Sequence, residues 1–153
     1  MTLSLCTESV SLNSGTLFVP RAFRTRPVTA AQVVSYAGKA QEYVDAAGSE
    51  LDQGRFVAAT SLAIHAAINA ADAVCGARLG QRAAGEDHDQ VLALLNQAGR
   101  DGAAVEKGLR RLLPLKTKAE YEPDDIAPAV AAEAVERAQR CVTVARSVAT
   151  ATQ

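Results

Sequence analysis

Apolar residues recur every three to four positions along most of the chain after residue 28, which is the spacing of helices with one buried face. The first helix is predicted to begin at Thr29, which can form a capping box with Gln32, while Val28 and Val33 can form a hydrophobic staple. It is predicted to end at Gly54. Its apolar face comprises Val33, Tyr36, Ala37, Ala40, Tyr43, Val44, Ala47 and Leu51.

The second helix is predicted from about Arg55 to Leu79, with Gly80 ending it. Because it is apolar on most sides, we expect it at the centre of a bundle. One narrow stripe on it is polar. This stripe is either a solvated or internally hydrogen-bonded seam, or the lining of a pocket or subunit interface. Its residues share one helix face and are Ser61, His65, Asn69 and Asp72.

Two further helices are predicted before residue 115. Asp87 is a good N-cap for the third, which Gly99 is expected to close. The fourth is predicted from about Asp101 to Leu113, and Pro114 is expected to end it because the residue before a proline avoids the helical region. Residues 115–124 are predicted to form a loop of mixed charge.

The last helix is predicted to begin near Asp125 or Ala127, with Pro128 in its first turn. A seam of small residues follows, which lets this helix approach an earlier helix or a second subunit closely. No strand pair stands out. The sequence therefore predicts an all-α fold, an antiparallel bundle of about five helices in a single domain over residues 29–150. The seam comprises Ala127, Ala131, Ala134, Ala138, Cys141, Ala145 and Val148.

Residues 1–28 are predicted to form a partly ordered N-terminal arm. Most of this segment is rich in Ser and Thr, lacks helical period, and carries short apolar runs. It is either a tail or an arm that lies across a partner subunit, and its removal should leave the bundle folded. Its basic residues are Arg21, Arg24 and Arg26.

Composition narrows the classes of function. A chain of 153 residues, 48% hydrophobic and 22% charged, is typical of one globular domain. Aromatic residues are only 4%, which argues against a stacking platform for single-stranded nucleic acid. The net charge of -1 gives no global field toward nucleic acid or a membrane, so any RNA contact must use a local patch.

The cysteines Cys6, Cys75 and Cys141 are odd in number and widely spaced, which does not suit a zinc site or a redox pair. We expect no metal and no cofactor. The N-terminus lacks the basic and apolar regions of a secretory signal, and no stretch approaches 18 consecutive apolar residues. These features favour a cytoplasmic protein with reduced thiols and no membrane partner.

The order of segments resembles the HEPN family of small helical bundles. Three segments carry the resemblance: the helical hairpin over residues 37–75, Asp87-His88 at the start of the third helix, and residues 118–121 ahead of the last helix. The resemblance covers roughly residues 30–150. It implies a bundle that often dimerises. Many such proteins are metal-independent endoribonucleases that act as toxins or in phage defence, often beside a nucleotidyltransferase antitoxin.

The nuclease members of that family carry an Arg followed after a short interval by a His, and here five residues separate Arg82 from His88. A histidine can move the proton of a 2′-hydroxyl while the planar guanidinium holds the phosphate, so the pair is the candidate catalytic site. The alternative is a surface histidine beside the capping Asp87. Ala83 stands where those members often carry a polar residue, and the acidic neighbours of His88 would repel phosphate.

A basic cluster in the predicted fourth helix and the loop after it is a second candidate binding site. It is either a solvated surface or a site for a nucleotide or an RNA backbone. The candidate residues are Lys107, Arg110, Arg111, Lys116, Lys118 and Tyr121.

Two functions remain open. The first is a non-catalytic HEPN-like module that binds a partner protein or a nucleotide or RNA in a toxin–antitoxin or defence system. The alternative is a metal-independent endoribonuclease that uses Arg82 and His88. A homodimer is expected because the chain has more apolar helix surface than one bundle needs. An antitoxin, a nucleotidyltransferase and RNA are the other candidate partners.

Overall fold

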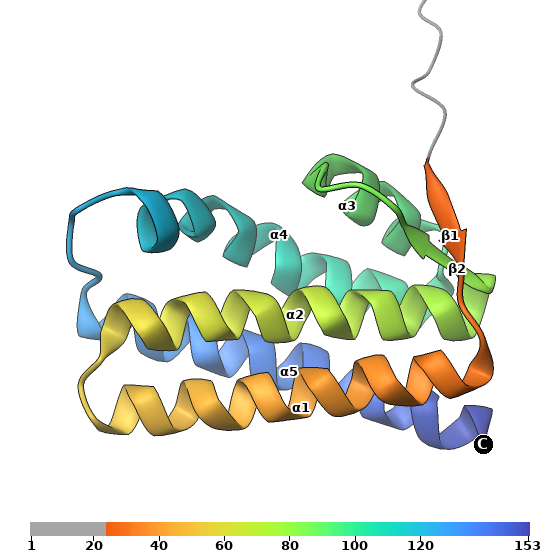
Figure 1. Cartoon of the computed structure of the whole chain (residues 1–153), viewed down its shortest axis with the longest axis horizontal. Coiled ribbons are helices and arrows are strands. Elements are labelled where there is room, and N and C mark those ends of the chain that lie inside the picture. Colours follow the sequence, from red (N-terminus) through yellow and green to blue (C-terminus); the bar gives the residue numbers. More distant parts are fainter. Residues whose placement is uncertain (1–23) are drawn as a thin grey trace, which may run out of the picture.

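The computed structural model describes residues 24–153, and these form five helices and one short two-stranded ribbon (Figure 1). The helices pack into one bundle with a continuous apolar core. The predicted all-α class is therefore confirmed. The elements are β1 (Thr25–Pro27), α1 (Ala30–Asp52), α2 (Phe56–Leu79), β2 (Gln81–Ala83), α3 (His88–Asn96), α4 (Gly99–Tyr121) and α5 (Pro128–Thr152).

The start of α1 follows the predicted capping chemistry. The Thr29 hydroxyl accepts a hydrogen bond from the Gln32 backbone N–H at 3.2 Å, and the Gln32 side chain accepts one from the Thr29 N–H at 2.9 Å. Val28 and Val33 are buried. Both lie against Gly76 of α2, where a Cβ would come within 2.6 Å of Val28 and 3.0 Å of Val33. The absence of a side chain at Gly76 therefore allows Val28 and Val33 to pack directly against α2.

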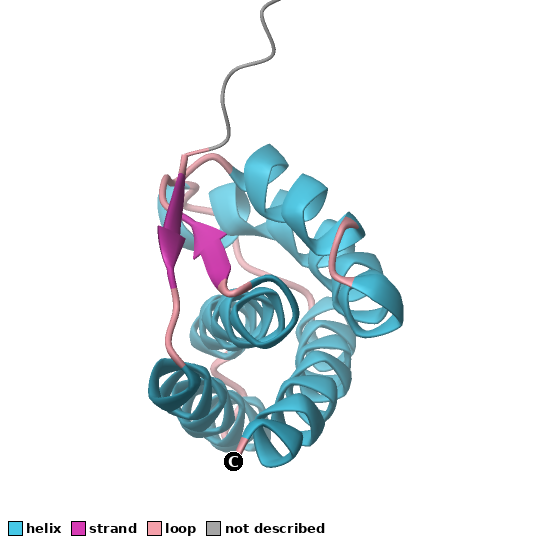
Figure 2. Cartoon of the chain, turned by 90° about the vertical axis from the view of Figure 1, so that its right-hand side faces the viewer, coloured by secondary structure: helices cyan, strands magenta, loops and turns pink. Residues whose placement is uncertain are grey.

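Helix α2 lies at the centre of the bundle, as predicted. It packs against α1, α4 and α5, and the end-on view shows it surrounded by these three helices (Figure 2). Its buried residues are mostly alanine, so its neighbours can approach closely. By length and composition alone α2 could also cross a membrane, although it forms the core here. The expected absence of a membrane partner stays a prediction.

Helix α4 is longer than predicted. The expectation that Pro114 ends it and that residues 115–124 form a loop is wrong, because the helix continues to Tyr121. The ring of Pro114 is exposed, while Leu112 and Ala119 on either side of it are buried. Burial of one continuous helix face outweighs the single backbone hydrogen bond that a proline removes. In Figure 1 α4 diverges from α2 toward its C-terminal end.

A two-stranded ribbon joins the N-terminal side of the bundle, although no strand pair was expected. β1 pairs antiparallel with β2, and Arg26 stands opposite Arg82. Each strand has only three residues, too few for an alternating pattern to predict it. The last residues of the predicted arm are thus joined to the bundle. The rest of the arm, residues 1–23, lies outside the described residues.

The small-residue seam of α5 packs inside the bundle. Apart from the exposed Ala127, its residues are buried against α1, α2 and α4 of the same chain. The seam therefore gives no separate support for a second subunit, and the homodimer stays a prediction. Asp87 caps α3 as predicted, but α3 ends at Asn96, and Gly99 is the first residue of α4 rather than the end of α3.

Candidate functional site

The polar stripe of α2 is half-buried, and part of it is satisfied within the helix. His65 Nδ1 lies 2.8 Å from the carbonyl oxygen of Ser61, and Asn69 Nδ2 donates to the carbonyl of His65 at 2.9 Å. A carbonyl only accepts, so Nδ1 carries the hydrogen in the first contact. Tyr43 of α1 lies beside His65, with ring centroids 5.5 Å apart. This half of the stripe fits the internally hydrogen-bonded seam.

The other end of the stripe is an ionic cluster beneath the ribbon. Arg82 of β2 places Nη1 3.9 Å from Oδ2 of Asp72, and its guanidinium lies 5.6 Å from the centre of the Tyr36 ring. Burial raises the pKa of Asp72 to about 6, and the charge of Arg82 partly opposes that rise. Arg82 therefore compensates a half-buried carboxylate and lies on an aromatic ring.

His88 has a different neighbour. At the first position of α3, its Nε2 lies 3.4 Å from Nζ of Lys116 on α4. A lysine ammonium only donates, so this ring nitrogen is the acceptor. Arg82 also donates to the carbonyl of Ala83 at 3.1 Å. Among the described residues, the interactions of Arg82 and His88 share no partner. The two residues of the predicted catalytic pair therefore have separate contacts within the chain, and their joint role stays a prediction.

The basic residues of α4 divide by their partners. Arg110 pairs with Glu106 one turn away, and Lys116 is occupied by His88. No acidic side chain in residues 24–153 pairs with the remaining three, which are Lys107, Arg111 and Lys118. All three are exposed. Tyr121, the other predicted binding residue of this region, is 75% exposed at the end of α4.

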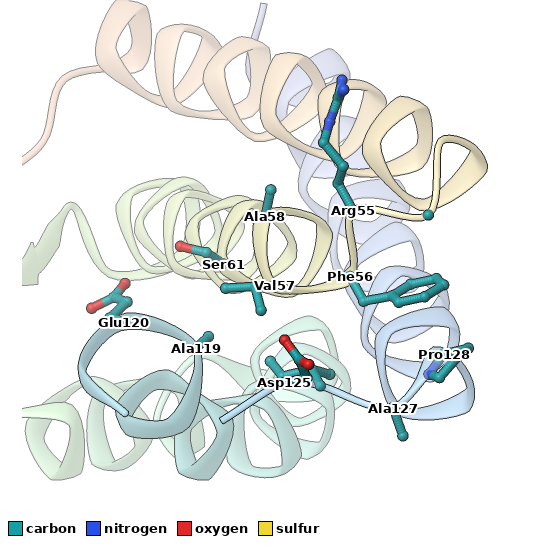
Figure 3. Close-up of a pocket in the computed structure, with 12 residues that line it drawn as sticks. Arg55, Phe56, Val57, Ala58, Ser61, Ala119, Glu120, Asp125, Ala127 and Pro128 are labelled. Atoms are coloured by element: carbon teal, nitrogen blue, oxygen red, sulfur yellow. The ribbon is translucent and has the colours of Figure 1, made fainter. Parts of the chain in front are cut away.

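A wide pocket among the described residues was not predicted. It has a volume of about 1070 Å³ and is open to solvent between the start of α2, the end of α4 and the start of α5 (Figure 3). Of the predicted stripe only Ser61 lines it, on the same wall as Val57. Glu120 and Asp125 lie on the facing wall. The pocket depends on the unexpected extension of α4, which is why sequence patterns did not indicate it.

A smaller cleft between α4 and α5 was also missed. Its volume is about 230 Å³, and it brings Lys107 of the predicted basic cluster beside Arg137 and Arg140 of α5. The sequence places these two arginines three residues apart on the polar side of the last helix. That spacing was a signal that they share a face. Which neighbour that face meets depends on how the helices pack.

The described cysteines are free and buried. Burial raises the pKa of Cys75 to about 12 and that of Cys141 to about 11, so neither is a ready thiolate. Cys6 lies outside the described residues. In the part of the chain that the structure describes, no three His, Cys, Asp or Glu side chains gather as metal ligands would.

The fold defines the chain as an all-α helical bundle. Comparison of the sequence with protein-family models finds no match, and comparison with curated proteins finds none either. The HEPN resemblance therefore stays a prediction that rests on the sequence segments given above.

Proposed function

We propose that this chain is a non-catalytic, HEPN-like helical module that binds RNA or a nucleotide, and that it works in the cytoplasm in a toxin–antitoxin or defence system. The observation that carries the proposal is the exposed cationic face of α4, where Lys107, Arg111 and Lys118 have no acidic partner among residues 24–153. Unpaired lysine and arginine side chains bind phosphate with little to displace except water and counterions.

The contacts of the Arg82–His88 pair support binding over catalysis. Metal-free cleavage needs a proton donor or acceptor and a cation at the same phosphate. Arg82 lies on Tyr36 near the half-buried Asp72, so a phosphate would compete with an existing carboxylate. A residue that already compensates a buried charge is poorly placed to bind a substrate.

The test is incubation of the purified protein with bulk RNA in EDTA, together with binding of a fluorescein-labelled single-stranded RNA. The expected result is intact RNA and a binding signal that falls as salt rises. If the wild type binds neither RNA nor a nucleotide at low salt, the proposal is wrong. Cleavage in EDTA that is lost in His88→Ala would replace it with the nuclease alternative.

One observation favours the alternative, a metal-independent endoribonuclease. Lys116 lies 3.4 Å from His88, so an imidazole and a cation meet at one point even without Arg82. If RNA is cleaved, His88→Ala and Lys116→Ala should both reduce the rate at least ~100-fold, within the range that general acid–base groups contribute. His65→Ala is the matched control and should leave the rate unchanged, because its ring is engaged within α2 and with Tyr43.

A homodimer and an antitoxin or nucleotidyltransferase partner belong to the same proposal. Dimerisation would offer two copies of the α4 face to one RNA, which raises affinity through multivalency. Light scattering at micromolar concentration measures the mass. A dimer mass is the expected result, and a monomer mass would remove the homodimer from the proposal while leaving RNA binding to be judged on its own assay.

A further inference from the structure

Helices α4 and α5 approach each other closely at Gly108. A Cβ at this position would lie 2.6 Å from Sγ of Cys141, closer than atoms of two side chains can stand. The Cys141 thiol in turn donates to the carbonyl of Val105, with sulfur and oxygen 3.8 Å apart. Because a glycine faces the partner helix here, the side chains that flank the contact on α4 and α5 come together around one cleft.

That cleft carries positive charge on both sides. Lys107 lines it from α4, and Arg137 and Arg140 line it from α5. Lys107 has no acidic partner among the described residues. The two arginines pair with Glu133 and Glu136, each one turn earlier on α5.

Those two ion pairs leave the arginines available. In the Arg137–Glu133 pair the arginine side chain is 25% exposed and the glutamate side chain 60% exposed, whereas both side chains of the Arg140–Glu136 pair are 66% exposed. Exposed pairs of this kind contribute little, because water solvates the separated charges nearly as well. A guanidinium can therefore exchange such a carboxylate for a phosphate that accepts two parallel hydrogen bonds.

The size and floor of the cleft fit a phosphate group. Its volume of about 230 Å³ lies below the ~300 Å³ at which pockets begin to enclose whole small molecules. Apart from the three cations, the lining is formed by small residues and one valine, which leave room for an anion; they are Ala104, Gly108, Cys141 and Val144. A group that is small, anionic and rich in acceptor oxygens matches this arrangement.

We propose that the α4–α5 cleft is a phosphate site, in which Lys107, Arg137 and Arg140 bind one phosphate of an RNA backbone or of a free nucleotide. This inference rests on the proposed function and adds the location of the contact. It also assigns a role to two α5 arginines that lie outside the basic cluster of α4.

The experiment compares charge reversals in the full-length protein by fluorescence anisotropy with a fluorescein-labelled single-stranded RNA of mixed sequence. The double variant Lys107→Glu/Arg140→Glu should bind ~10-fold or more weakly, because two charge-assisted contacts are lost. The slope of its log affinity against log salt should become shallower by about 0.7, the value for one phosphate contact on a single strand. The matched control is Lys39→Glu/Arg146→Glu, with the same change in net charge on α1 and on an exposed position of α5 outside the cleft. Its affinity should stay within ~2-fold of wild type, because surface charges beyond the contact are largely screened.

Competition with ATP and with inorganic phosphate identifies the source of the phosphate. Displacement of RNA from the wild type by either ligand, but not by equal ionic strength of chloride, assigns the cleft to free phosphate groups as well as RNA. Displacement only by unlabelled RNA assigns it to the backbone. A second variant, Lys107→Gln/Arg140→Gln, with unchanged circular dichroism, separates loss of binding from loss of folding.

The failures are distinguishable. Wild type that binds no RNA, ATP or phosphate overturns the proposed function and this inference together. Wild type that binds RNA, with equal affinities for the cleft variants and the α1/α5 control, overturns the cleft while leaving RNA binding in place.

Discussion

Helices α2 and α4 have nearly equal lengths, 24 and 23 residues, but opposite uses of polar residues. On α2 the polar side chains are half-buried and have partners within the chain, as with His65, Asn69 and Asp72. On α4 the three cations Lys107, Arg111 and Lys118 are exposed and have no acidic partner in the described part of the chain. A row of polar residues on a helix therefore indicates a binding surface only when its members are left without internal partners.

The largest effect should come from placing a charge on the buried side of α2. Ala67 is fully buried, so Ala67→Glu places an unpaired carboxylate in the core and should cost more than about 4 kcal/mol. The matched change on α4, Ala103→Glu, lies on an exposed position and should shift stability by less than about 0.5 kcal/mol. Urea unfolding followed by circular dichroism measures both. Equal losses would mean that the two helices are not buried to different extents.

Asp72→Asn tests the ionic cluster at the end of the α2 stripe. The pKa of Asp72 rises from 3.8 to about 6 on folding, so the folded state binds a proton more tightly than the unfolded state. Stability from this group is therefore present at pH 4 and is lost as pH rises from about 4 to about 6. At pH 7 the asparagine variant should be more stable than wild type by up to about 3 kcal/mol, since one pKa unit corresponds to 1.36 kcal/mol.

The difference in the free energy of unfolding between wild type and Asp72→Asn should shrink toward zero at pH 4, where the wild-type carboxyl is also neutral. Asp52→Asn is the control, because Asp52 is exposed on α1 and should show no comparable change between the two pH values. An asparagine variant that is less stable than wild type at pH 7 would mean that the contact with Arg82 outweighs the burial of the charge.

Pro114→Ala should have a smaller effect, confined to α4. Alanine restores the N–H that donates within the helix, and the exposed proline ring gives up no core packing. An increase in stability of about 1 kcal/mol is expected, less than the full cost of proline in a helix because α4 has already adjusted to it. Thermal unfolding measures the change. A decrease would contradict this expectation and would mean that the proline favours the folded state at this position more than alanine does.

The structural features that could be predicted were those that depend on residues close together in the sequence. Thr29 with Gln32, and Gly80 at the end of α2, were indicated because a cap and its partner lie a few residues apart. The prediction that the fourth helix ends at Pro114 was wrong, because burial of the residues on both sides of the proline outweighs its usual effect on a helix. The β1–β2 pair was not predicted, because it joins two segments of three residues that lie far apart in the sequence.

Part of the arrangement of the candidate residues could be predicted, while their role stays a prediction. Shared position on a helix face was readable from spacing, so Asp72 and His65 were placed on one stripe. Partners on other elements were not readable, which is why Tyr36 and Tyr43 of α1 were missed as neighbours of Arg82 and His65. Likewise, the sequence spacing between Arg82 and His88 does not indicate which residues each of the two side chains contacts.

The most direct test of the account is the affinity of the wild-type protein for a labelled single-stranded RNA in EDTA, measured over a salt series, with the RNA recovered on a gel afterwards. The expected result is full-length RNA and a plot of log affinity against log salt with a slope of about −0.7 or steeper, because one phosphate contact on a single strand contributes about −0.7. No salt-dependent binding, or RNA shortened in a way that requires His88, would contradict it.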